Sequence, residues 1–273
     1  MDRLLIKDYR HKDAIRISKT NDILFLILKN EDFHNDEINI ELEKDVKTNI
    51  LIENLTFNKR INLTLKAHSE IEIKAVLKDN INTFNLKANL ENNASFVAYF
   101  ADFSTGNNKI KVDINLNGDN SKAVWHLASL SAKDDNKEFD ISLYHNGLNT
   151  YGLSDNYGVS KDDARLVFSG VSLIKNGSKN SKTRQNAKIM VFDDLSKAIA
   201  KPILKIDENE IEASHGASVG KINDEHMFYL TSRGLTEETA KELITMGYLK
   251  PILNGFEEEE IKEEISSLIE GRM

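Results

Sequence analysis

Apolar and polar residues alternate over most of the chain, in short runs separated by turn residues. From Ile23 to Leu173 the alternation follows the period of two that β-strands show, and Asn, Asp and Gly fill the breaks. A clear run is Ile110–Leu116, in which every second residue is apolar. The pattern predicts many short strands, each with one face buried and the other facing solvent.

Three segments of the middle region resemble one another. They start at Leu65, Leu90 and Leu116, 25 and 26 residues apart, and each passes through a polar turn and a small residue into an alternating strand. A fourth copy is predicted to start at Val159. This recurrence favours a solenoid of stacked rungs, and a parallel β-helix fits best. A β-sandwich also has alternating strands and stays open as the alternative. The abundance of asparagine favours the solenoid, because stacked turns accept left-handed Asn and Asn ladders.

The pattern changes to a helical one after Ile222. Asn223 or Asp224 is suited to cap a first helix, and Gly234 is placed to end it. Thr236 is suited to cap a second helix, whose first turn carries two glutamates that favour the helix dipole.

The second helix is expected to close at Gly247, and a third helix is expected after Pro251. The third helix carries apolar residues at helical spacing: Ile261, Ile265, Leu268 and Ile269. We therefore expect an N-terminal segment over 1–30, a parallel β-helix core over 31–222 and a C-terminal helical subdomain over 223–273.

Composition narrows the classes of function. The net charge is −8, from 36 basic and 44 acidic residues, and the lysines are scattered among acids, which argues against a nucleic-acid partner. No run of about 18 apolar residues is present, and charges occupy the N-terminal residues where a signal peptide would be apolar. We expect a soluble, cytoplasmic protein without a membrane partner.

The chain contains no cysteine. This excludes disulfides, thiolate nucleophiles and any iron–sulfur site built from its own sulfur atoms. The glycine-rich phosphate loop and the serine-hydrolase elbow are also missing from the sequence, so nucleotide hydrolysis and serine hydrolase chemistry have no support. We expect the chain not to be an enzyme.

The stretch Ile211–Gly234 holds the most informative of the seven histidines. His215 precedes small residues that cannot cover its ring, namely Gly216, Ala217 and Ser218. A metal-ligand role and a turn-forming role are both open for it. Burial with a satisfied hydrogen bond is the plain interpretation of His126, whereas burial and function are both open for His145. The histidines lack the local spacing of a metal site, so a metal centre would be assembled across rungs or chains.

Three pairs of adjacent carboxylates raise the question of a glycan-cleaving site. Neighbours in a strand point to opposite faces, so an adjacent pair does not by itself make a joint site. All three pairs are predicted to lie in solvated turns: Asp134-Asp135, Asp162-Asp163 and Asp193-Asp194.

Several segments follow one another in a distinctive order: Leu116–Asp119, Phe139–His145, Val167–Gly170, Thr183–Asn186 and Lys201–Leu204. With the stretch from Pro202 to Leu253, this ordered set resembles the SufB/SufD family, the scaffold subunits of the SUF iron–sulfur cluster assembly system. His145 and Gln185 lie within these family landmarks. The resemblance covers about residues 90–255.

The resemblance implies a mainly β fold, a right-handed parallel β-helix with a C-terminal α-helical subdomain. It also favours the SufD side of the family. SufB-like chains usually carry His-Glu where this chain has His215 and Gly216, and some supply a cysteine on the β-helix. Some SufD sequences have a cysteine at the position of Ala213, so His215 is the contribution that remains.

The function implied by the resemblance is that of a non-catalytic scaffold subunit that pairs with a SufB-like subunit and a SufC-like ATPase. His215 would face SufB and ligate an iron–sulfur cluster shared with it, while this chain alone binds no cofactor. The helices from Asp224 to Tyr248 resemble the region that engages SufC, and the residues expected there are Phe228, Tyr229, Leu230, Arg233 and Leu235. Most of these apolar side chains are also needed to hold the helical subdomain together.

Two alternatives to this function stay open. One is a SufB-like chain that carries the cluster in its own right, and the other is a β-helix protein that acts on glycans. In isolation the chain is also open to forming a homodimer.

Overall fold

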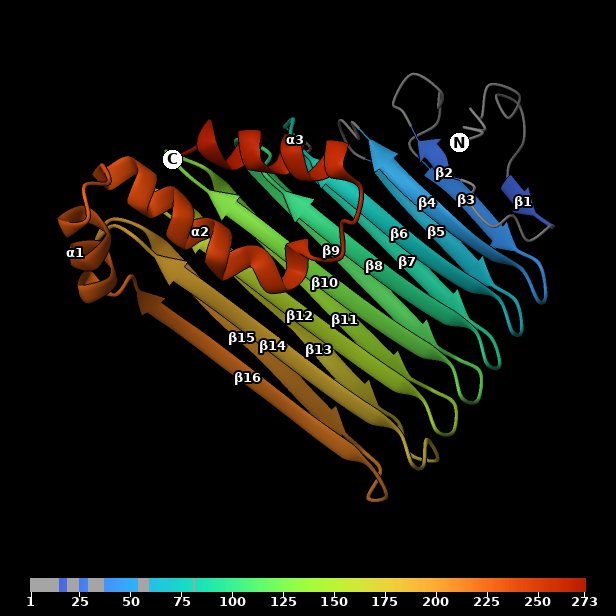
Figure 1. The fold of residues 1–273 in the computed structure, drawn as a ribbon. Coiled ribbons are helices and arrows are strands. Elements are labelled where there is room, and N and C mark those ends of the chain that lie inside the picture. Colours follow the sequence, from blue (N-terminus) through green and yellow to red (C-terminus); the bar gives the residue numbers. More distant parts are fainter. Residues whose placement is uncertain (1–14, 19–24, 29–36, 54–58, 81) are drawn as a thin grey trace.

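Two parallel eight-stranded sheets make up most of the chain (Figure 1). In the computed structural model the described residues are 15–18, 25–28, 37–53, 59–80 and 82–273. The chain crosses from one sheet to the other after each strand, so the neighbours within a sheet are every second strand of the sequence. This connectivity is that of a parallel β-helix.

Sheet A contains the even-numbered strands: β2 (Phe25–Leu28), β4 (Lys47–Glu53), β6 (Glu70–Leu77), β8 (Ser95–Asp102), β10 (Lys122–Ser131), β12 (Tyr151–Ser160), β14 (Lys182–Val191) and β16 (Glu212–Lys221). Sheet B contains the odd-numbered strands: β1 (Ile15–Ile17), β3 (Glu37–Leu42), β5 (Lys59–Leu65), β7 (Thr83–Leu90), β9 (Asn107–Leu116), β11 (Asn136–His145), β13 (Arg165–Ile174) and β15 (Lys197–Ile206). Most of the predicted N-terminal segment 1–30 lies outside the described residues. Within it, β1 pairs with β3 and β2 pairs with β4.

The main hydrophobic core lies between the two sheets. Strand β9 shows the principle, because its alternate residues Ile110, Val112, Ile114 and Leu116 are buried while those between them point outward. Pairing stacks equivalent residues of successive rungs, so Leu65 lies beside Leu90 and Leu90 beside Leu116. The predicted fold class is therefore confirmed, and the β-sandwich alternative is wrong.

Left-handed residues mark the corners at which the chain passes from sheet B to sheet A. At these corners they are Asp45, His68, Asn93, Asn120, Asn149 and Asn180, all with φ between 55° and 63°, and Asn82, Lys133 and Asp162 are left-handed at corners of the opposite kind. The amide of one corner donates to a carbonyl of the next, as from Asn93 to Asp119 over 2.8 Å. Asparagine tolerates this conformation better than most residues. The expectation that asparagine supports stacked turns is confirmed, and side-chain ladders such as Asn146 to Asn117 at 2.8 Å accompany them.

The fourth sequence repeat was predicted at the wrong corner. The first three segments cross from sheet B to sheet A, whereas the segment from Val159 crosses from β12 in sheet A to β13 in sheet B. The residue that pairs with Leu116 in the next rung is His145. The prediction fails because both corners combine a polar turn with a small residue, so the sequence pattern does not distinguish them.

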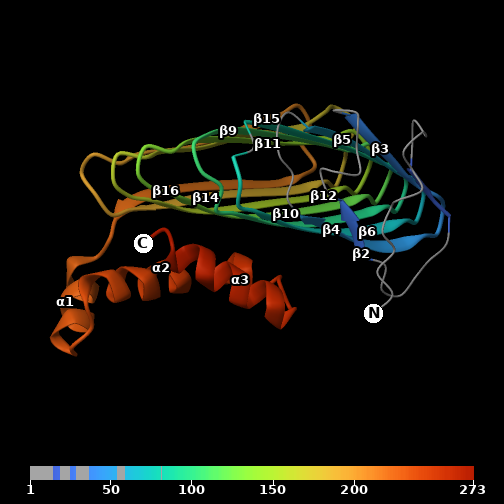
Figure 2. The same cartoon turned by 90° about the horizontal axis from the view of Figure 1, so that it is seen from above.

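Three helices, α1 (Asp224–Ser232), α2 (Glu237–Leu253) and α3 (Glu259–Glu270), follow the sheets. Figure 2 shows α2 and α3 along the outer face of sheet A, with α1 beyond the end of β16. A second apolar cluster joins α2 and α3 to that face and includes Phe103, Leu130, Leu249 and Phe256. None of the described helices is long and apolar enough to span a membrane.

The helix caps were predicted correctly, but the end of the second helix was not. Asn223 caps α1 and Thr236 caps α2 through side-chain bonds to backbone amides. Helix α2 continues through Gly247 and includes Pro251 in its last turn. The apolar residues beyond Gly247 are buried in the second cluster, and this burial outweighs the weak helix propensity of glycine and proline.

Candidate functional site

Both sheets end at one open edge of the solenoid, formed by β15 and β16. No further described strand pairs with either of them on its outer side. Nine of the ten residues of β16 are exposed, although the strand is paired with β14 along its full length. Backbone donors and acceptors on the free side of β16 are therefore available to a partner.

His215 stands in the middle of this edge strand. It pairs with Gln185 of β14, which pairs with Ser154 of β12, which in turn pairs with Trp125 of β10. Trp125, Ser154 and Gln185 all point into the space between the sheets and are at most 4% exposed. Because paired residues share one face, His215 continues this inward column, but at the open end its ring is exposed.

The column turns polar as it approaches the open end. Trp125 donates its Nε1–H to Asn156 Oδ1 at 3.2 Å, and Asn156 Nδ2 donates to Ser154 Oγ at 3.0 Å. Gln185 Oε1 is buried and finds no hydrogen-bond partner among the described residues. The cavity that Gln185 lines here has a volume of only ≈ 10 Å³, about the room that one water needs. The cavity beside Gln185 is therefore too small to hold a metal cluster.

His145 is an interior residue in the column of Leu116. It is 0% exposed, and its Nδ1 lies 2.7 Å from Thr150 Oγ1, which lies 2.7 Å from Ser181 Oγ. Burial lowers the pKa of His145 from 6.5 to about 4, so the ring is neutral at pH 7. Gly152 makes room for it, because a Cβ at Gly152 would lie 2.8 Å from His145 Nε2. This family landmark is therefore remote from solvent.

His126 lies on the outer face of sheet A, and its predicted hydrogen bond is absent. Its ring stacks on Tyr99 with centroids 4.8 Å apart, while Nδ1 has no hydrogen-bond partner among the described residues and lies 3.8 Å from Asp155. Burial lowers the pKa of His126, and the nearby carboxylate of Asp155 opposes that effect. Asp155 accepts from Asn186 at 2.5 Å, and Asn186 pairs with Gly216.

The prediction of solvated turns fails for Asp135. This carboxylate is buried, accepts from two backbone amides and forms an ion pair with Arg272. A second buried pair lies nearby, between Lys137 and Asp102, and the sequence reasoning missed it. Both residues follow the inward period of their strands, after Phe100 in β8 and before Phe139 in β11, so alternation could have revealed them.

The described residues contain no group of three or more His, Asp, Glu or Cys side chains that could hold a metal ion. His215 is thus a single exposed imidazole, which can supply one nitrogen ligand to iron.

The residues expected at an ATPase contact lie on and just after α1. Phe228 and Tyr229 are 74% and 56% exposed, and the Arg233 guanidinium lies 5.2 Å from the Tyr229 ring centroid. Leu230 and Leu235 are half-buried. Helix α1 has no buried residue, so its two aromatic side chains are not needed to hold the helices together.

Comparison with known proteins places these features in a family. Residues 26–248 match the family described as "SUF system FeS cluster assembly, SufBD core domain". The chain is 30% identical over 159 residues to the iron-sulfur cluster assembly protein SufD of Bacillus subtilis, which covers 58% of this chain and 36% of the relative. It is 26% identical over 136 residues to a SufBD family protein of Staphylococcus saprophyticus, covering 50% of this chain and 29% of the relative.

A SufBD family protein of Mycobacterium bovis is 23% identical over 200 residues, covering 70% of this chain and 23% of that relative. The chain thus spans about a third or less of the length of the curated relatives it matches. The match runs from β2 through β16 and α1 into α2, and it ends before α3.

Proposed function

Because the chain belongs to the SufBD family of SUF iron–sulfur cluster assembly proteins, we propose that it acts as a SufD-like, non-catalytic scaffold subunit. In this role it pairs with a SufB-like subunit and a SufC-like ATPase. The observation that carries the proposal is the position of His215, an exposed imidazole at the centre of a free edge strand.

The edge strand supports pairing with a second β-helix. A partner strand can add to the free side of β16 through backbone hydrogen bonds. Exposed apolar side chains accompany the edge, with Val219 48% and Ile199 45% exposed. Such side chains supply the buried area that backbone bonds alone do not provide.

The side chains that this chain offers as ligands support a shared cluster. This chain offers one imidazole at the edge and has no cysteine, so thiolates must come from the SufB-like partner. The iron–sulfur cluster is the product that the complex assembles and passes on. The chemistry of this subunit is confined to a neutral nitrogen donor placed at the interface.

ATP hydrolysis belongs to the third subunit in this proposal. Helix α1 offers it two exposed aromatic rings next to an arginine, residue types that are enriched at the centres of interfaces. The energy of ATP would then move the two β-helices relative to each other and so open or close the cluster site.

The histidine is tested in the co-expressed complex with SufB-like and SufC-like subunits. His215→Ala should leave complex assembly intact and lower the iron and sulfide content severalfold, because one ligand is lost. The matched control is His68→Asn, which removes an exposed imidazole from a left-handed corner where Asn is tolerated. Unchanged iron and sulfide in His215→Ala would refute the ligand role. A stable cluster on this chain alone would instead support a SufB-like scaffold.

The ATPase contact is tested with the isolated chain and a SufC-like protein. Phe228→Ala should weaken binding by about 2 kcal/mol if this ring is a central anchor. The free energy of unfolding should change by less than about 0.5 kcal/mol, since the ring is exposed. Leu243→Ala, which truncates a side chain 48% exposed on α2, is the control. If the two variants bind the SufC-like protein with equal affinity, Phe228 and its helix α1 are not part of the contact.

A further inference from the structure

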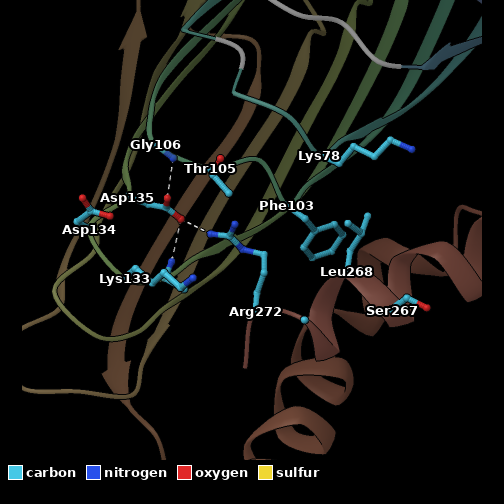
Figure 3. A pocket seen from close by; sticks show the side chains of 12 residues that line it. Lys78, Phe103, Thr105, Gly106, Lys133, Asp134, Asp135, Ser267, Leu268 and Arg272 are labelled. Atoms are coloured by element: carbon cyan, nitrogen blue, oxygen red, sulfur yellow. Dashed lines mark hydrogen bonds and ion pairs between the residues drawn. The ribbon is translucent and has the colours of Figure 1, made fainter.

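A buried ionic joint attaches the end of α3 to the solenoid (Figure 3). Asp135, in the corner after β10, accepts from Gly106 N at 2.7 Å and Ala132 N at 3.0 Å. Its Oδ2 also pairs with the guanidinium of Arg272, which follows α3, and their side chains are 4% and 12% exposed. A carboxylate buried in this way needs its cation, because the amides alone do not balance its charge.

A second buried pair lies behind the joint. Lys137 Nζ lies 2.7 Å from Asp102 Oδ2 and donates to the Leu130 carbonyl at 2.8 Å, and neither charged side chain is exposed. Burial lowers the pKa of Lys137, Asp102 raises it, and Arg272 lowers it, so the two pairs act on each other electrostatically. Removing Arg272 would therefore disturb a set of four charges rather than one contact.

The joint lies beside a solvent-open pocket at the end of α3. A cavity of ≈ 530 Å³ lies between the end of α3 and the corners 103–106 and 132–135, bordered by Phe103 and Leu268. Figure 3 shows Arg272 reaching across this space to Asp135. Ile265 and Ile269 of α3 are buried in the second apolar cluster, so the ionic joint adds a polar attachment to their apolar packing at this end.

Further polar ties run along the same helix toward the earlier rungs. Lys74 Nζ lies 3.2 Å from Glu258, Lys78 Nζ lies 2.5 Å from Glu264, and Lys161 Nζ donates to the Met273 carbonyl at 2.5 Å. The lysines come from β6, the corner after it and the corner after β12. Together with the joint, these ties span four rungs of sheet A.

Helix α1 is held in a different way. It has no buried residue, and it connects directly to β16 through Ile222 and Asn223. At its other end Gly234, with φ of +94°, turns the chain into α2. Thus α1 lies between the strand that carries His215 and a helix fixed to the core.

We propose that the Asp135–Arg272 joint makes α2 and α3 a fixed strut that delivers movement at α1 to the solenoid and its His215 edge. Without the joint, α3 would shift on the solenoid, so that a displacement of α1 would move the helices and not the sheets. Arg272 is a positioning residue in this scheme, since it touches neither His215 nor the exposed face of α1. The coupling rests on the proposed function, whereas the strut itself is a property of this chain alone.

The strut is tested by hydrogen exchange on the isolated full chain. Arg272→Gln should speed the exchange of α3 amides by roughly a hundredfold, as expected for loss of one partner of a buried ion pair. Exchange in β12 and β14 should stay unchanged. Lys262→Gln is the control, because it breaks an exposed pair with Glu259 on the same helix. Equal α3 protection in both variants would overturn the strut.

If Arg272→Gln unfolds the chain, Arg272→Lys is the second variant. It should fold and show an intermediate rate of α3 exchange, and wild-type protection of α3 in this variant would also overturn the strut.

The coupling is tested in the complex with SufB-like and SufC-like subunits. Arg272→Gln should keep the binding affinity and the ATPase rate while the cluster formed per ATP falls severalfold, and Arg272→Lys should recover part of it. An unchanged yield per ATP, despite faster α3 exchange, would overturn the coupling. Failure of the unaltered chain to bind the ATPase would overturn the proposed function and the coupling with it, while the exchange data still decide the strut.

Discussion

The neutral histidine inside the solenoid predicts a specific loss of stability in acid. His145 replaces leucine in a column that runs through Leu65, Leu90 and Leu116. Its ring is buried against Gly152 and has one hydrogen bond, to Thr150. A proton on this ring would be held in an apolar stack without a counter-charge beside it, so the folded state resists protonation.

The magnitude follows from the pKa. Burial lowers the pKa of His145 from 6.5 to about 4, so between these values the unfolded chain binds a proton that the folded chain does not. The stabilisation is present above pH 6.5 and is lost as the pH falls toward 4. At about 1.4 kcal/mol per pH unit, the full loss is about 3 kcal/mol, of which about 2.5 kcal/mol is lost by about pH 4.5.

The measurement compares the chain with His145→Leu by urea unfolding at about pH 7.5 and about pH 4.5. Leucine restores the residue type of the column and cannot titrate, while any cost from the Thr150 hydroxyl is the same at both pH values. The free energy of unfolding of the wild-type chain should fall by about 2.5 kcal/mol more than that of the variant. Equal falls would mean that His145 does not remain neutral in the folded state, and the reasoning would be refuted.

Two further substitutions test the interior. Gly152→Ala would place a Cβ 2.8 Å from the His145 ring, so we expect a loss of about 1–3 kcal/mol in urea unfolding, and the loss should shrink when His145→Leu is added. Lys137→Met leaves the buried Asp102 without its cation and should cost about 3–5 kcal/mol by the same assay. Adding Asp102→Asn should recover part of that loss, whereas strict additivity of the two substitutions would argue against a coupled pair.

Alternation was a reliable guide to the solenoid because in strands such as β9 one face points into the core and the other points outward. A residue that shares the period of Ile110 and Val112 lies inside, whatever its chemistry. The same rule applies to Lys137 and Asp102. Both are charged, but the alternation of buried residues in their strands places them on the inward face. Polarity alone would place both residues outside.

Contacts between residues far apart in the sequence could not be predicted from the alternation. Asp135 is a turn aspartate in sequence, and its burial depends on Arg272, which is 137 residues away. The continuation of α2 through Gly247 likewise depends on sheet A, which buries Leu249 and Ile252 beyond it. For the candidate site, the small neighbours of His215 correctly indicated an uncovered ring. Its place at the end of a polar column required the register of four strands.

The open edge has a consequence for how the last rung is held. Repeat proteins commonly finish with a capping rung that has a polar outer face, whereas here the described chain leaves β16 for α1, and α2 and α3 then lie along the outer face of sheet A. The rung formed by β15 and β16 is stacked on one side only among the described strands and is therefore prone to fray. A partner bound there acts as the missing cap, so the order of the His215 strand should rise with partner concentration. Diluting the complex would release the partner, and the β15–β16 rung would then lose order.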